Sequence, residues 1–161
     1  MPDIMMRCHT LLVTGVFALA LGLLLGVTPA RAICTPPAAS GVTATCTGVT
    51  VNQNAPDGYG TSLNDNVTVN VLTGASVIGT NEGIATGDDL ILTNNGFIRG
   101  IGSDGVDSSD DIRSLINFGT IIGADDGVDA QDDVNSLINH GVIIGVAGDG
   151  VDANDDELRS L

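Results

Sequence analysis

The sequence predicts an all-β fold, a parallel β-solenoid (β-helix) with coils of about 22 residues, an N-terminal signal peptide helix and a disulfide-stapled cap. A motif of fixed order recurs along the chain, which is typical of repeat architectures. The 161 residues are 43% hydrophobic but only 2% aromatic and contain no Trp. Such a chain cannot build a core from large rings, so we expect a core of thin rows of Val, Ile, Leu and Ala.

Residues 1–32 have the layout of a secretory signal peptide. A polar start is followed by the apolar run 11–27 and by the small-residue pattern Ala30-Arg31-Ala32. The alternative is a retained membrane helix, because 17 apolar residues approach the length that spans a bilayer. Pro29 and the small-residue pattern favour cleavage after Ala32. We therefore expect export through the inner membrane, to the cell surface, the outer membrane or the extracellular space.

Residues 33–56 are predicted to form an N-terminal cap. Of the three cysteines, Cys8 lies in the signal peptide, which leaves Cys34 and Cys46 as a pair. In an exported chain such a pair is most simply a disulfide. A metal site would need more ligands than two thiols, and a redox pair usually has the spacing CxxC.

Residues 57–161 are predicted to form the solenoid. The tetrapeptide DGVD occurs at 104–107, 126–129 and 149–152, and each copy is followed by an acidic pair. Including two divergent units, the repeats begin at positions 22 to 25 residues apart: Asp57, Glu82, Asp104, Asp126 and Asp149. Each unit has short runs rich in Val and Ile between Gly, Asn and Asp, and these are strand and turn signals. No unit has a helical spacing, which disfavours leucine-rich and helical repeats.

Stacked coils place equivalent residues in columns about 4.8 Å apart. We expect three columns to point into the core: Val106, Val128 and Val151; Ile112 and Val134, with Leu158 if Glu157 is an insertion; and Ile98, Ile121 and Ile143.

Two further columns are predicted from the same alignment. Asn94, Asn117 and Asn139 should hydrogen-bond from coil to coil. Gly96, Gly119 and Gly141 follow them, and we expect a bend with positive φ there. The column of Arg99, Ile122 and Ile144 either points outward, where two exposed Ile side chains would indicate a partner surface, or is a crowded core position.

The acidic residues are the candidate site. Twelve of them form a lattice when the coils are stacked: Asp104, Asp107, Asp110, Asp111, Asp126, Asp129, Asp132, Asp133, Asp149, Asp152, Asp155 and Asp156. Carboxylates about 5 Å apart repel each other, and screening, raised pKa values, Arg113 and Arg159, or bound cations can relieve the repulsion. Carboxylate oxygens suit Ca²⁺, although the spacing matches neither an EF-hand nor the nonapeptide Ca²⁺ repeat. The alternative is that Asp-Gly makes the turns and the charge keeps the sheets soluble.

Composition and motifs exclude or disfavour several functions. With 5 Lys+Arg against 20 Asp+Glu, the net charge is −15, and such a chain repels nucleic acid. The DGVD…DD pattern locally resembles polygalacturonases, which use Asp residues as acid and base. A catalytic site, however, breaks a repeat at one coil, whereas here every coil has the same acids. No GxSxG, HExxH or P-loop motif is present, and His140 aligns with Asn95 and Phe118 as an ordinary turn-flanking residue. We therefore expect no catalytic residues.

The signal peptide, the Cys34–Cys46 pair and the repeat LINFGTIIGADDGVDAQDDVNSLINHGVIIG together resemble the N-terminal part of autotransporter (type V secreted) passengers of Gram-negative bacteria. The resemblance implies a right-handed parallel β-helix that a C-terminal outer-membrane β-barrel translocator, which this sequence lacks, carries to the cell surface. The last repeat stops at Leu161 in mid-unit, so we expect a truncated passenger.

Taken together, these features predict a non-enzymatic exported solenoid with a structural, adhesion or interaction role, and a host-surface or protein partner. The alternatives are a Ca²⁺-stabilised binding module that uses the Asp columns and, more weakly, a polysaccharide-acting enzyme fragment.

Overall fold

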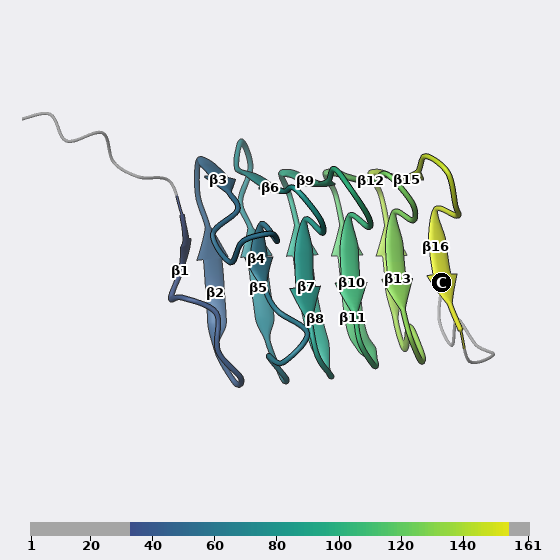
Figure 1. Cartoon of the computed structure of the whole chain (residues 1–161), viewed down its shortest axis with the longest axis horizontal. Coiled ribbons are helices and arrows are strands. Elements are labelled where there is room, and N and C mark those ends of the chain that lie inside the picture. Colours follow the sequence, from purple (N-terminus) through teal and green to yellow (C-terminus); the bar gives the residue numbers. More distant parts are fainter. Residues whose placement is uncertain (1–32, 155–161) are drawn as a thin grey trace, which may run out of the picture. The chain divides into compact units, whose positions relative to one another are not determined.

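The computed structural model describes residues 33–154, and these form a parallel β-solenoid with no α-helix (Figure 1). The predicted signal peptide lies outside the described residues, as do Asp155, Asp156, Leu158 and Arg159. In the part of the chain that the structure describes, no helix has the length and hydropathy needed to cross a membrane. The predicted fold class is confirmed.

Three sheets run along the solenoid, and each takes one strand from every coil. Sheet 1 has the order β1 (Cys34–Thr35), β2 (Thr43–Cys46), β5 (Thr68–Val71), β8 (Leu90–Asn94), β11 (Ile112–Asn117) and β14 (Leu137–Asn139). Sheet 2 has the order β3 (Val49–Val51), β6 (Ser76–Gly79), β9 (Phe97–Gly100), β12 (Thr120–Gly123) and β15 (Val142–Gly145). Sheet 3 has the order β4 (Tyr59–Gly60), β7 (Ile84–Thr86), β10 (Val106–Ser108), β13 (Val128–Ala130) and β16 (Val151–Ala153).

The strands pair in parallel with the register that the repeat predicts. Val128 pairs with both Val106 and Val151, so the coils are 22 and 23 residues long. Ile121 likewise pairs with Ile98 and Ile143 in sheet 2. Ile112 forms a parallel bridge with Val134. The residues of these columns are buried, apart from the half-buried Ile143 and Val151 of the last coil. The three predicted core columns are therefore confirmed as far as the described residues extend.

The N-terminal end is closed by an antiparallel strand and a disulfide. Cys34 in β1 pairs with Cys46 in β2, and a disulfide joins the two side chains. The side chain of Gln53 holds β1 from the other side, because it accepts from the backbone N–H of Cys34 and donates to its carbonyl, both at 2.8 Å. Within the segment predicted as a cap, β2 and β3 already pair in parallel with β5 and β6.

The predicted Asn ladder is present at the corner between sheets 1 and 2. Asn94 Nδ2 donates to Asn117 Oδ1 at 2.8 Å, and Asn117 Nδ2 donates to Asn139 Oδ1 at 2.9 Å. Each Asn Oδ1 also accepts the backbone N–H of the glycine two residues later. Because Asn94 and Asn117 are fully buried, the ladder satisfies amides that would otherwise be costly to bury.

The predicted reason for the corner glycines is wrong. Among residues 33–154, the glycines with positive φ are Gly41, Gly48, Gly60 and Gly74, and none belongs to the column of Gly96, Gly119 and Gly141. The column is glycine for a steric reason, since a Cβ on Gly119 would lie 2.1 Å from the carbonyl oxygen of Gly96 in the preceding coil. The glycines let neighbouring coils approach each other closely.

The column of Arg99, Ile122 and Ile144 points outward from sheet 2. These residues pair in register, Arg99 is exposed, Ile122 is half-buried and Ile144 is 41% exposed. The alternative, a crowded core position, is thereby excluded.

Candidate functional site: the acidic columns

The register gathers the acidic residues along one side of the solenoid, on and around sheet 3. One column lies in the loops that enter this sheet and consists of Asp57, Glu82, Asp104, Asp126 and Asp149. A second column, Asp107, Asp129 and Asp152, lies on the strands themselves. Asp110, Asp111, Asp132 and Asp133 follow in the turns that lead to sheet 1. The stacking of the lattice within the described residues agrees with the sequence alignment.

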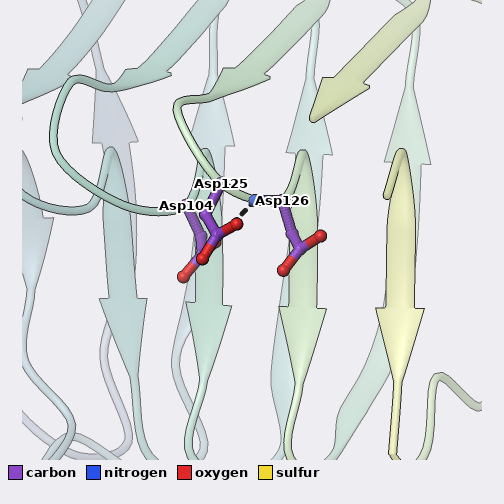
Figure 2. A group of neighbouring side chains, drawn as sticks. All are labelled: Asp104, Asp125 and Asp126. Carbon is purple, nitrogen blue, oxygen red and sulfur yellow. Dashed lines mark hydrogen bonds between the residues drawn. The ribbon is translucent and has the colours of Figure 1, made fainter. Parts of the chain in front are cut away.

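Carboxylates of the first column accept hydrogen bonds from the backbone of the next coil. Asp104 Oδ1 accepts the N–H of Asp126 at 2.8 Å, and Asp126 Oδ1 accepts the N–H of Asp149 at 2.5 Å. Figure 2 shows the first of these bonds, between the N–H of Asp126 and the Asp104 carboxylate. Ser103 Oγ donates to Asp104 Oδ2 at 2.9 Å. An aspartate repeated at this position therefore fastens one turn to the next.

In the turns after sheet 3, aspartate carboxylates also accept backbone N–H groups of the next coil. Asp111 Oδ1 accepts the backbone N–H of Asp133 at 3.0 Å, and Asp65 Oδ1 accepts that of Asp88 at 3.1 Å. Asn135 Nδ2 also donates to Asp111 Oδ2 at 3.4 Å. Hydrogen bonds from neutral donors to ionised acceptors are among the stronger ones in proteins. Asp65, Asp104, Asp111 and Asp126 therefore each fasten a loop or turn to the backbone of the next coil.

Arg113 neutralises an acid outside the predicted lattice. Its guanidinium binds Asp89 through both Nε, at 3.0 Å, and Nη2, at 2.5 Å. Asp89 occupies the position before Leu90, one coil below Asp111. Arg113 therefore relieves repulsion between carboxylates of neighbouring coils, but its partner, Asp89, is not a residue of the predicted lattice.

In the column on sheet 3, the carboxylates repel one another, and their pKa values are raised. Burial raises the pKa of the Asp107 carboxyl to about 6, and neighbouring charges, of which that of Asp129 is the largest, add to the shift. Burial also raises the pKa of Asp129, followed by the charges of Asp104 and Asp152. Asp129 Oδ2 accepts from Gln131 Nε2 at 2.9 Å, whereas its Oδ1 is buried without a hydrogen-bond partner.

Two acids of the divergent coils join this site although the predicted lattice does not include them. Burial raises the pKa of Glu82 to about 7, and a side-chain hydrogen bond with Asp57 adds to the shift. Asn81 Nδ2 donates to Glu82 Oε1 at 2.7 Å. Asp57 is only 8% exposed, and its Oδ1 is buried without a partner. The sequence held the signal for both residues, because they begin the first two repeats.

Three groups of carboxylates are close enough together to hold a cation. In each group, one ligand oxygen per residue lies within 4.8 Å of the others: Asp104, Asp125 and Asp126 (Figure 2); Asp104, Asp107 and Asp129; and Asp110, Asp111 and Asp132. Asp125 is not in the predicted lattice, because the equivalent residues of the neighbouring coils are Ser103 and Gly148. A residue that occurs in one coil only leaves no trace in an alignment of repeats.

His140 is the residue that aligns with Phe118 in the preceding coil. The two rings are stacked with their centroids 5.2 Å apart and an interplanar angle of 22°. Both side chains are exposed at the corner between sheets 1 and 2. The stack places His140 at the turn-flanking position that the alignment predicts.

No protein-family model, curated protein sequence or solved structure matches this chain.

Proposed function

We propose that the chain is a non-enzymatic, exported β-solenoid that serves as a structural scaffold and presents an outward face to a partner. The observation that carries this proposal is the use of the acids in coil after coil. The carboxylates of Asp104, Asp111 and Asp126 accept backbone N–H groups of the next coil, so these acids have a structural role in the stack of coils. A single catalytic centre would instead distinguish one coil from the others.

Export is supported by the signal-peptide pattern of residues 1–32 and by the disulfide between Cys34 and Cys46. Disulfides persist in oxidising compartments. We propose delivery to the cell surface or the extracellular space as in autotransporter passengers, with a C-terminal β-barrel translocator as the partner in secretion. Expression of the chain in a Gram-negative host should yield a processed, disulfide-bonded form beyond the inner membrane. A precursor that stays in the cytoplasm with reduced thiols would contradict export.

The face offered to a partner is the outer surface of sheet 2. Its outward positions contain exposed apolar residues: Val49 is 59% exposed, Val51 57%, Val142 46% and Ile144 41%. These positions carry no acid, although the chain as a whole has a charge of −15. An apolar, acid-free strip on an acidic protein indicates an interaction surface.

The interaction role is tested with the double variant Ile122→Thr, Ile144→Thr. We expect it to fold like the wild type and to lose most of the binding of the purified, labelled chain to host-cell surfaces. The matched control is Ile116→Thr, which changes an outward residue of sheet 1. Equal binding by all three proteins would contradict the use of sheet 2, and equal loss in both variants would point to general destabilisation.

A further inference from the structure

We propose that the side chain of Asn66 is the acceptor of an N-linked glycan. Of the twelve asparagines in the chain, Asn66 alone begins the motif Asn-X-Ser/Thr with X other than Pro, as Asn66-Val67-Thr68. This motif is the acceptor sequence for N-glycosylation in exported proteins. The inference goes beyond the scaffold role proposed above, because it adds a covalent modification to a loop outside sheet 2.

The motif crosses from the loop before β5 into the first position of that strand. Val67 is 1% exposed and packs in the core, as does Val69 two residues later. Asn66 is exposed, and Thr68 is half-buried at an outward position of β5. Since side chains alternate between the two faces of a strand, the core holds the middle residue of the motif and leaves Thr68 on the outer surface.

The amide of Asn66 is available because its side chain makes no hydrogen bond to any of residues 33–154. Its loop is nevertheless fixed. The backbone N–H of Asn66 donates to the carbonyl of Asp88 in the next coil at 2.8 Å. Asp65 Oδ1 accepts the N–H of Asp88 at 3.1 Å, and Asn64 Oδ1 accepts the N–H of Thr61 at 3.0 Å. The loop therefore presents one free amide on an ordered backbone.

Comparison with the next coils shows that Asn66 departs from the repeat. The register of sheet 1 aligns it with Asp89 and Asp111. Asp89 binds Arg113, and Asp111 accepts the N–H of Asp133. Asn66 and Asp89 both have positive φ, 54° and 61°, a conformation that Asn and Asp tolerate better than most residues. The turn thus accounts for Asn or Asp at this position, but no contact between coils accounts for the amide in place of the acid.

The modification joins C1 of a sugar to Nδ2 of Asn66. The donor is a sugar activated by phosphate at C1, either a nucleotide sugar or a lipid-linked pyrophosphate sugar. The bond between C1 and the phosphate oxygen breaks, the phosphate group leaves with the electron pair, and Nδ2 loses one proton. A separate glycosyltransferase catalyses the transfer, and this chain provides only the acceptor.

The first experiment treats the folded full chain with UDP-glucose and a soluble N-glycosyltransferase that recognises Asn-X-Ser/Thr. Peptide mapping by mass spectrometry locates the sugar. We expect one hexose per chain, on the peptide that contains Asn66. Asn95 is also exposed but is followed by Gly and Phe, so it should remain unmodified and serves as the internal control. A synthetic peptide of residues 63–71 shows that the enzyme is active.

Two variants of Thr68 form a matched pair. Thr68→Val keeps the β-branched shape on β5 but removes the hydroxyl that completes the motif, whereas Thr68→Ser keeps the hydroxyl. We expect the first to abolish the modification and the second to retain it, with circular dichroism like that of the wild type in both. Asn66→Gln should also abolish it. Equal modification of the wild type and Thr68→Val would contradict recognition of this motif.

The second experiment maps the chain isolated from the cells that naturally produce it. We expect a glycan on Asn66. An unmodified Asn66 in that chain would overturn the proposal, as would a folded chain that the transferase leaves unmodified while it modifies the synthetic peptide. A chain that has the glycan but stays in the cytoplasm would support the acceptor site and contradict export alone.

Discussion

Hydrogen bonds made by single polar side chains hold neighbouring coils together. Asn117 shows this most clearly, because its amide takes part in four hydrogen bonds of 3.2 Å or shorter. Its Oδ1 accepts from Asn94 Nδ2 and from the N–H of Gly119, and its Nδ2 donates to Asn139 Oδ1 and to the carbonyl of Val142. It is fully buried, so none of these bonds can be exchanged for water.

The Asn ladder predicts the effect of Asn117→Ala. The change leaves the amide of Asn94 and the N–H of Gly119 without their acceptor in a buried corner, and we expect the free energy of unfolding to fall by about 2 kcal/mol or more. Urea unfolding followed by circular dichroism measures the loss. Asn70→Ala, at a half-buried outward position of β5, is the control and should have a much smaller effect. Similar losses for both variants would show that the ladder adds no stability.

At the scale of the element, sheet 3 combines parallel pairing with a row of acids. Asp107 and Asp129 occupy paired positions on adjacent strands, and like charges in such positions destabilise a sheet. Burial and the neighbouring charges raise the pKa of Asp107 to about 6 and that of Glu82, in the loop before β7, to about 7, so the folded chain retains protons that the unfolded chain would release.

These pKa values predict that the metal-free protein is more stable in weak acid than at neutral pH. The ordinary values are 4.5 for Glu82 and 3.8 for Asp107. Since the folded values are higher, the folded chain binds more protons, and stability is lost as pH rises from about 4 through 7. In EDTA, the melting temperature should fall by several degrees between pH 5 and pH 8. Glu82→Gln should flatten this dependence, whereas Asp88→Asn should leave it unchanged. A melting temperature that rises over this range would contradict the assignment.

At the scale of the whole solenoid, the repeat is enough to predict the architecture. Because the unit is about 22 residues long and its letters recur, the sequence alone assigns Val106, Val128 and Val151 to one column, and their pairing in sheet 3 confirms it. The Asn ladder follows from the same alignment. A residue that recurs at a fixed interval must occupy the same environment in each coil, so its neighbours along the column are known.

Features that depend on the distances between coils could not be predicted from the sequence. Gly119 looked like a conformational glycine, but the reason for it is the carbonyl oxygen of Gly96, which approaches from another coil. Whether Ile122 faced inward or outward depended on the pleat of sheet 2. Asp125 was missed because it occurs once, and Asp57 and Glu82 were missed as site residues because their coils diverge from the DGVD pattern. Residues that break a repeat are the ones that an alignment of repeats overlooks.

The in-register stacking of the coils is the central claim, and cysteine cross-linking on the outer face of sheet 2 tests it most directly. Thr120 and Val142 are paired neighbours in adjacent coils, whereas Phe97 and Val142 are two coils apart. Two Cα atoms must lie within about 7 Å for a disulfide to form, and adjacent coils are about 4.8 Å apart. We predict that Thr120→Cys, Val142→Cys forms an intramolecular disulfide under mild oxidation and that Phe97→Cys, Val142→Cys does not. Cross-linking of the second pair, or of neither pair in a folded protein, would contradict the stacking.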